Sequence, residues 1–231
     1  EEWETLAQLL DLAQREDGLK PCIGRYRVGS FSALLTQLDE HSELIVRVDR
    51  DPENDEDPVP VRLFHLLDRP LVPAEAAGEL TLDTVPQVVA QLTVRDADVE
   101  SEEPGMAVLA GREGEELDRA TERFVEIAGA EVELLSDEDV GNEAGQFPRE
   151  FADLAVTWHF APRTSVAIKR SLHQQHVERF VTQTWPATPL AVFGDRAPGD
   201  VAGDPDSRVA LRGALRVLET VCEQYGLAAD L

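Results

Sequence analysis

Two histidines on one predicted helix have the spacing that metal binding requires. His173 and His176 lie three positions apart, so both side chains project from one side of a helix and are near enough to share a metal ion. No neighbouring cysteine or carboxylate completes a ligand set, because Glu178 projects elsewhere on the helical wheel. We interpret the pair as exposed histidines on a polar helix face. His159, which alternates with two aromatic residues, is interpreted as a partly buried structural histidine.

Two loops have compositions that suggest ligand binding, and in both the detailed pattern argues against it. Residues 111–115 (GREGE) follow a predicted strand and precede a predicted helix, which is where a phosphate-binding loop stands. The segment lacks the lysine of such a loop, and its carboxylates repel phosphate. Residues 50–58 (RDPENDEDP) cluster carboxylates without the glycine and ligand spacing of a calcium loop. We therefore predict a solvated loop over residues 50–58.

The residues that could act as nucleophiles lack the context that activates them. Ser30 stands in the sequence Gly-Ser-Phe-Ser, which is no nucleophile elbow and indicates a helix cap. Cys22 and Cys222 are far apart and neither belongs to a C-x-x-C pair, so we expect small apolar packing and no disulfide framework. The sequence therefore predicts no catalytic, cofactor-binding or metal-binding residue, and an enzyme of unrecognised type remains an alternative.

The elements that position these residues follow from periodicity and turn residues. Helices are expected over residues 2–16, after Ser30, over 115–128, over about 164–184, and from Asp204 onward. Strands are expected over residues 22–28, 43–49, 61–67, 80–82, 88–94, 105–111, 131–135 and 154–160. Strands 43–49 and 61–67 are predicted to pair as a hairpin, and residues 105–135 to form a β-α-β unit.

This order of elements predicts an α+β fold. We expect a mainly antiparallel sheet with helices on one face, and a C-terminal loop and helix that close the core. The chain is divided into an acidic α+β body over residues 1–150 and a strand plus helical region over residues 151–231.

The segment from Trp185 to Tyr225 has the clearest local pattern. Asp204 and Pro205 indicate a helix start, because aspartate caps free N–H groups and proline fits the first helical position. The prolines after Trp185 are expected to prevent a helix there. We predict that this segment forms either a clasp over the protein's own core or a contact with a protein partner. The residues predicted to carry that interaction are Trp185, Leu190, Phe193, Arg208, Arg212 and Leu215.

The same segment resembles a signature found in a widespread group of bacterial proteins. The matching positions are Trp185, Pro189, Leu190, Gly194, Pro198, Ala202, Asp204, Pro205, Arg208, Leu211 and Leu215. They resemble the pattern W-x3-PL…GG-x-TP…P-x2-R…LL and are similar to the toxin-binding C-terminal region of ParS/MbcA-type antitoxins. Asp195 and Ala197 depart from the second glycine and the threonine of that pattern. The resemblance covers about the last fifth of the chain and implies an antitoxin-like, toxin-binding protein.

The charge of the chain is strongly negative and unevenly distributed. The net charge is −25 at pH 7, with a sequence pI near 4.4. Residues 151–231 hold eight basic and nine acidic side chains, whereas residues 1–150 hold 13 and 37. Such a body repels phosphate, so nucleic-acid binding is not expected. We interpret the acid load as a solubilising surface, as in adaptation to a salty cytoplasm, with a docking face for a basic partner as the alternative.

The sequence contains no apolar run of membrane-spanning length and no signal-type segment, so a cytoplasmic protein without a membrane partner is expected. Its first residue is a glutamate, which is consistent with a processed form or a piece of a longer protein. The favoured function is a non-enzymatic protein-interaction module without a cofactor. The sequence does not specify its oligomeric state.

Overall fold

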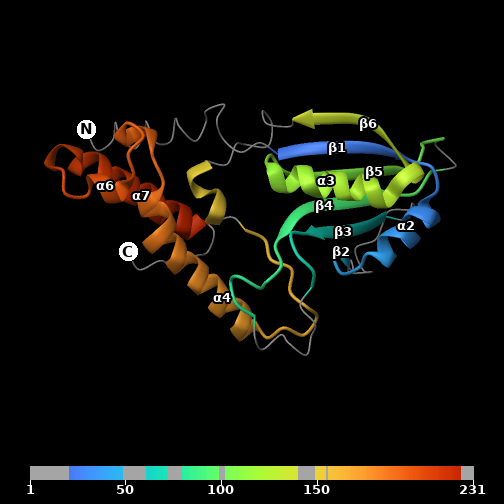
Figure 1. Ribbon diagram of the computed structural model, residues 1–231, viewed down its shortest axis with the longest axis horizontal. Helices are drawn as coiled ribbons and strands as arrows, with labels where there is room; N and C mark the ends of the chain where they lie inside the picture. Colours follow the sequence, from blue (N-terminus) through green and yellow to red (C-terminus); the bar gives the residue numbers. More distant parts are fainter. Residues whose placement is uncertain are drawn as a thin grey trace.

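A six-stranded antiparallel sheet lies beside a group of helices (Figure 1). This computed structural model describes residues 21–48, 61–71, 80–98, 102–139, 149–154 and 156–224. The strands are β1 (Pro21–Val28), β2 (Ile45–Val48), β3 (Val61–Leu67), β4 (Val88–Arg95), β5 (Met106–Arg112) and β6 (Val132–Asp139). The principal helices are α2 (Phe31–Glu40), α3 (Glu115–Ala128), α4 (Val166–Arg179) and α7 (Arg208–Gln224). The predicted α+β class is confirmed; the helix predicted over residues 2–16 and the acidic loop over 50–58 lie outside the described residues.

The strand order is β2-β3-β4-β5-β1-β6, and every neighbouring pair is antiparallel. The predicted hairpin is confirmed, because β2 pairs with β3 across the acidic segment. The predicted β-α-β unit is present as β5-α3-β6, with β1 inserted between its two strands. The unit is therefore a split one, in which β5 and β6 run parallel without pairing with each other.

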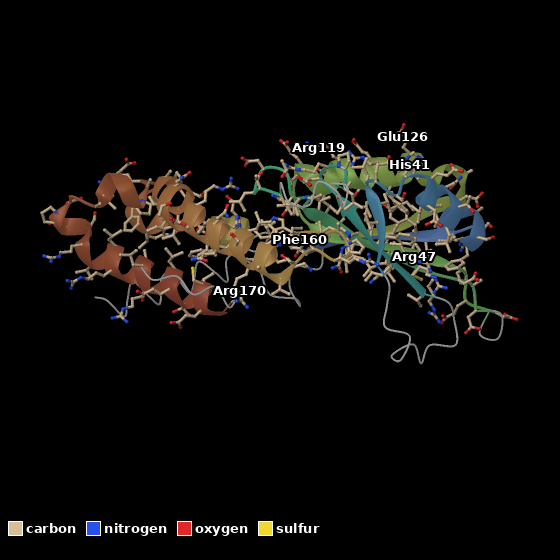
Figure 2. All side chains as sticks on the ribbon, turned by 90° about the horizontal axis from the view of Figure 1, so that it is seen from below. His41, Arg47, Arg119, Glu126, Phe160 and Arg170 are labelled. Carbon is tan, nitrogen blue, oxygen red and sulfur yellow. The ribbon has the colours of Figure 1, made fainter. Side chains whose placement is uncertain are left out.

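Helices α2 and α3 pack on the same face of the sheet, which we call the helix face. Leu34 and Leu38 of α2 and Phe124 of α3 are fully buried, and all belong to one apolar core. The ring of Phe124 meets Tyr26 of β1 edge-on, with the ring centroids 5.2 Å apart. Figure 2 shows both helices on one side of the sheet, with the α3 residue Arg119 on the side away from it. The expected placement of helices on one face is confirmed.

The C-terminal helices build a separate core of their own. After α4, the chain makes a π-helical turn (Phe180–Thr184), then α5 (Trp185–Ala187), a 3-10 turn (Ala191–Phe193) and α6 (Pro198–Val201), before a 3-10 turn (Pro205–Ser207) leads into α7. The predicted helix start is confirmed, since the Asp204 side chain accepts hydrogen bonds from the Asp206 N–H and the Ser207 hydroxyl. We call α4 to α7 the helical unit. This loop and helix close the core of the helical unit, and that core is distinct from the core under α3.

Three local predictions differ from the structure. Residues 82–84 form a turn where a strand was expected over 80–82. The segment predicted as a strand over 154–160 makes a single bridge between Trp158 and Gln87, because its alternating aromatic side chains pack into a small third core. Pro186 lies within the short helix α5, which directly continues the π-helical turn, because the Trp185 N–H still donates to the Phe180 carbonyl oxygen.

The contact between α3 and the end of the sheet predicts the effect of one glycine substitution. A Cβ at Gly111 would lie 2.5 Å from Leu117 Cδ1 and 2.9 Å from the Val89 carbonyl oxygen. We expect Gly111→Ala to lower the free energy of unfolding by about 1–3 kcal/mol, because the backbone of β4 cannot yield as a side chain can. Gly203→Ala is the matched control, since nothing lies within 4 Å of a Cβ there. Urea denaturation measures both, and equal stabilities of the two variants would contradict the packing described.

Candidate functional site

Three of the six predicted interaction residues lie inside the helical unit. Trp185, Leu190 and Phe193 are only 4–5% exposed and belong to the core that α7 closes. A partner can reach these three side chains only if the unit unfolds. Arg208, Arg212 and Leu215 lie on the outer side of α7, where Leu215 is 37% exposed. The structure thus separates the predicted set into a buried clasp and a surface group, and binding of a toxin-like partner by the surface group stays a prediction.

The side of the sheet opposite α2 and α3 presents apolar side chains in cross-strand rows. No helix in the described part of the chain lies over this side, which we call the uncovered face (Figure 2). Its rows, from the strand register, are Arg27–Met106–Arg95–Val61, then Arg25–Val108–Thr93–Leu63–Val48, then Ile23–Ala110–Gln91–His65–Val46. The aliphatic members other than Val61 are half-buried, and none of them belongs to any of the three apolar cores.

The uncovered face also has an unusual charge for this chain. Its rows across β1 to β5 contain arginines and no aspartate or glutamate, whereas β6 continues the same rows at the sheet edge with Glu133 opposite Arg27 and Glu138 opposite Ile23. Arg27 is exposed, and no ion-pair partner for it is present among the described residues. Arg95 is held by Glu103 at 3.0 Å. An apolar surface that bears cations within an acidic body is a candidate docking surface.

A cleft of about 780 Å³ continues from the end of this face. Ile23, Ala110 and Gln91 of the third row line it, and so do Thr157 and His176 of the C-terminal region. The cleft extends to the start of α3, where it is also lined by Glu113, Glu115 and Glu116. The sheet and the helical unit therefore form its two walls, and its volume is in the range of small-molecule and peptide sites.

His176 has one ring nitrogen without a partner in this cleft. The residue is 8% exposed, and its Nε2 lies 2.5 Å from the carbonyl oxygen of Asp153. Because a carbonyl only accepts hydrogen bonds, Nε2 carries the proton and Nδ1 is left as an acceptor. Nδ1 is buried and unpartnered. Burial lowers the pKa of His176, which favours this neutral tautomer.

The structure corrects one of the histidine predictions. His176 is buried, not exposed as the sequence suggested, because α4 presents it to Asp153 and to the ring of Trp158, 5.2 Å away. His173 is exposed as predicted and lies 4.6 Å from the same ring. His159 is half-buried as predicted, and its Nδ1 lies 3.3 Å from Nδ1 of His65 on the uncovered face. The sequence contained no signal for this last contact, which joins residues 94 positions apart.

The nucleophilic and metal-ligating groups of the described residues lie as follows around the cleft. Cys222 is buried in the helical core, where burial raises the pKa of its thiol, and it does not line the cleft. His176 faces no described side chain that it could activate, because its free nitrogen has no hydrogen-bond partner. Among the described residues, no three histidine, cysteine or acidic side chains are grouped to hold a metal ion.

Comparison with models of known protein families, with curated proteins and with solved structures finds no match to this chain. Function is therefore argued from the geometry. In the part of the chain that the structure describes, every helix is too short or too polar to cross a lipid bilayer.

The separation of the C-terminal residues into a buried and a surface group predicts unequal costs of truncation. We expect Phe193→Ala to lower the free energy of unfolding by about 3–5 kcal/mol, because it leaves a cavity in the helical core. Leu215→Ala is expected to cost less than about 1 kcal/mol, because solvent already reaches that side chain. Thermal and urea unfolding of both variants test this. A Phe193→Ala protein whose free energy of unfolding equals that of the original protein would show that Phe193 belongs to a surface.

Proposed function

We propose that this chain is a non-enzymatic protein-binding module whose uncovered face holds an acidic, amphipathic helix of a partner protein. The observation that carries the proposal is the composition of that face, with half-buried aliphatic residues between arginines and no carboxylate on β1 to β5. The sheet already packs two helices on its helix face. A third helix on the opposite side would complete a three-layer arrangement that buries both faces of the sheet.

Charge complementarity favours an acidic occupant over a second copy of this chain. Two uncovered faces packed together would bring the exposed Arg27 of both copies into one interface, and like charges at an interface are unfavourable. An acidic partner would be repelled by most of this chain, whose net charge is −25, and attracted by this one surface. The repulsion elsewhere would direct such a partner to the face.

The test uses a synthetic 18-residue amphipathic helix with leucines on one side and glutamates on the other. We expect it to shift the methyl NMR signals of Val48, Leu63 and Val108, and Val108→Glu to weaken binding by at least about tenfold, because the new carboxylate is placed against apolar and acidic groups. Thr93→Glu is a second variant, at a position that is already polar. Val125→Glu is the matched control, since Val125 is a 43% exposed valine on α3 and lies off the face.

Three results would contradict the proposal. The peptide could bind with equal strength to the Val108→Glu and Val125→Glu proteins, or shift signals of α7 in place of those of the sheet. A counterpart peptide with serines in place of the leucines could bind as tightly, which would leave no role for the apolar rows. Finally, sedimentation could show a dimer that Val108→Glu dissociates, which would identify a second copy as the occupant.

A further inference from the structure

Four of the five histidines of the chain meet where the helical unit joins the sheet. His65 and His159 face each other with their Nδ1 atoms 3.3 Å apart. His173 and His176 flank the ring of Trp158, at centroid distances of 4.6 and 5.2 Å. The fifth histidine, His41, is exposed at the end of α2 and belongs to no such cluster.

The junction is made by two backbone hydrogen bonds and a small apolar core. The Val88 N–H donates to the Thr157 carbonyl oxygen at 2.7 Å, and the His159 N–H donates to the Pro86 carbonyl oxygen at 2.9 Å. Trp158 fills a small apolar core with Val85 and Leu172, and Figure 2 shows Phe160 between the sheet and the helices. His176 also contacts the helical unit itself, because Asp153 lies between Phe151 and Leu154 of the core closed by α7.

The His65–His159 contact requires that at least one of the two rings is neutral. An N–H of one ring can donate to the bare nitrogen of the other only while one of the two nitrogens is unprotonated. If both rings carry protons, both nitrogens are donors, and two positive charges lie 3.3 Å apart. Burial lowers the pKa of His65, and the facing His159 lowers it further.

The other charged groups at the junction are two cations, Lys169 and Arg179, and two carboxylates, Asp83 and Asp153. Burial lowers the pKa of His159, and Lys169, which lies over the Phe160 ring, adds to the effect. Burial also lowers the pKa of His173. His176 faces Arg179, which pairs with Asp83 at 3.1 Å, and Asp153, whose carbonyl oxygen and charge partly offset the effect of burial.

The lowered pKa values of these histidines determine how the closed form of the junction responds to pH. Each of these histidines has a lower pKa in the closed junction than in an open, solvated one, where values near 6.5 return. The closed form is therefore fully favoured above about pH 6.5 and loses stability as the pH falls below it. The opening equilibrium rises about tenfold per pH unit for each histidine that takes up a proton only in the open form.

We propose that the junction is an acid-operated hinge: between about pH 7 and 5 the helical unit separates from the sheet and opens the cleft, while both main cores stay folded. Histidines are the side chains whose ordinary titration falls in this interval, and His65 and His159 face each other across the junction. The inference rests on the junction contacts and is independent of what binds the uncovered face.

Amide hydrogen exchange of the full chain at pH 7.5 and 5.5, corrected for the intrinsic effect of pH, tests the hinge. We expect the amides of Val88 and His159 to lose protection at least tenfold at pH 5.5, while amides of β5 and α7 keep theirs. The radius of gyration from small-angle scattering should rise in the same interval. Parallel loss of protection in all elements, or no loss at the junction, would overturn the proposal.

Glutamine variants separate titration from simple loss of a side chain, because glutamine donates and accepts hydrogen bonds without titrating. His159→Gln is expected to move the opening to lower pH and to make it less steep, and His65→Gln is a second variant should His159→Gln loosen the junction at pH 7.5. His41→Gln is the matched control and should leave the midpoint unchanged. Equal shifts in the His41→Gln and His65→Gln proteins would assign the pH response to charge of the whole chain and contradict the hinge.

Discussion

The packing of α3 on the centre of the sheet is the interaction on which the rest of the structure depends. Phe124 lies edge-on to Tyr26, and Leu117, Ala120 and Ala128 continue the same apolar side of the helix. This contact determines which face of the sheet is buried from solvent. By placing both helices on one side, it leaves the Val, Leu, Met and Ile side chains of the opposite alternation facing outward, and it positions the start of α3 at the rim of the cleft.

The C-terminal region adds a second body without covering the first. Its core is made by its own residues, including Trp185, Leu190 and Phe193. It meets the sheet through a short paired segment and a group of histidines around Trp158. The joint combines this polar group with a small apolar core of Val85, Trp158 and Leu172.

Much of this fold could be predicted from local sequence. The expected bounds of α3 agree with the structure, because its apolar residues recur at helical spacing and Gly129 ends it. The insertion of β1 between β5 and β6 could not be predicted, because strand order depends on contacts between distant segments. The sequence did contain a pattern that indicates an apolar second face. In β3 and β5 most side chains on both sides of the strand are apolar, as in strands that are buried on both sides. The strand predicted over residues 154–160 was wrong, because the same alternation of aromatic residues also suits packing beside a helix.

Met106 provides the most direct measurement of whether the second face of the sheet is open in the free protein. It is the single methionine of the chain and lies in the first row of the uncovered face, so a 13C-labelled methionine methyl group gives one signal. Paramagnetic relaxation of that signal by an inert gadolinium chelate reports solvent contact. Because Met106 is half-buried, we expect relaxation clearly stronger than that of the buried Leu92 methyl groups and weaker than that of a surface methyl group such as Val166, which is 69% exposed. Relaxation as weak as that of the buried Leu92 methyl groups would show that the face is already covered and would contradict the account.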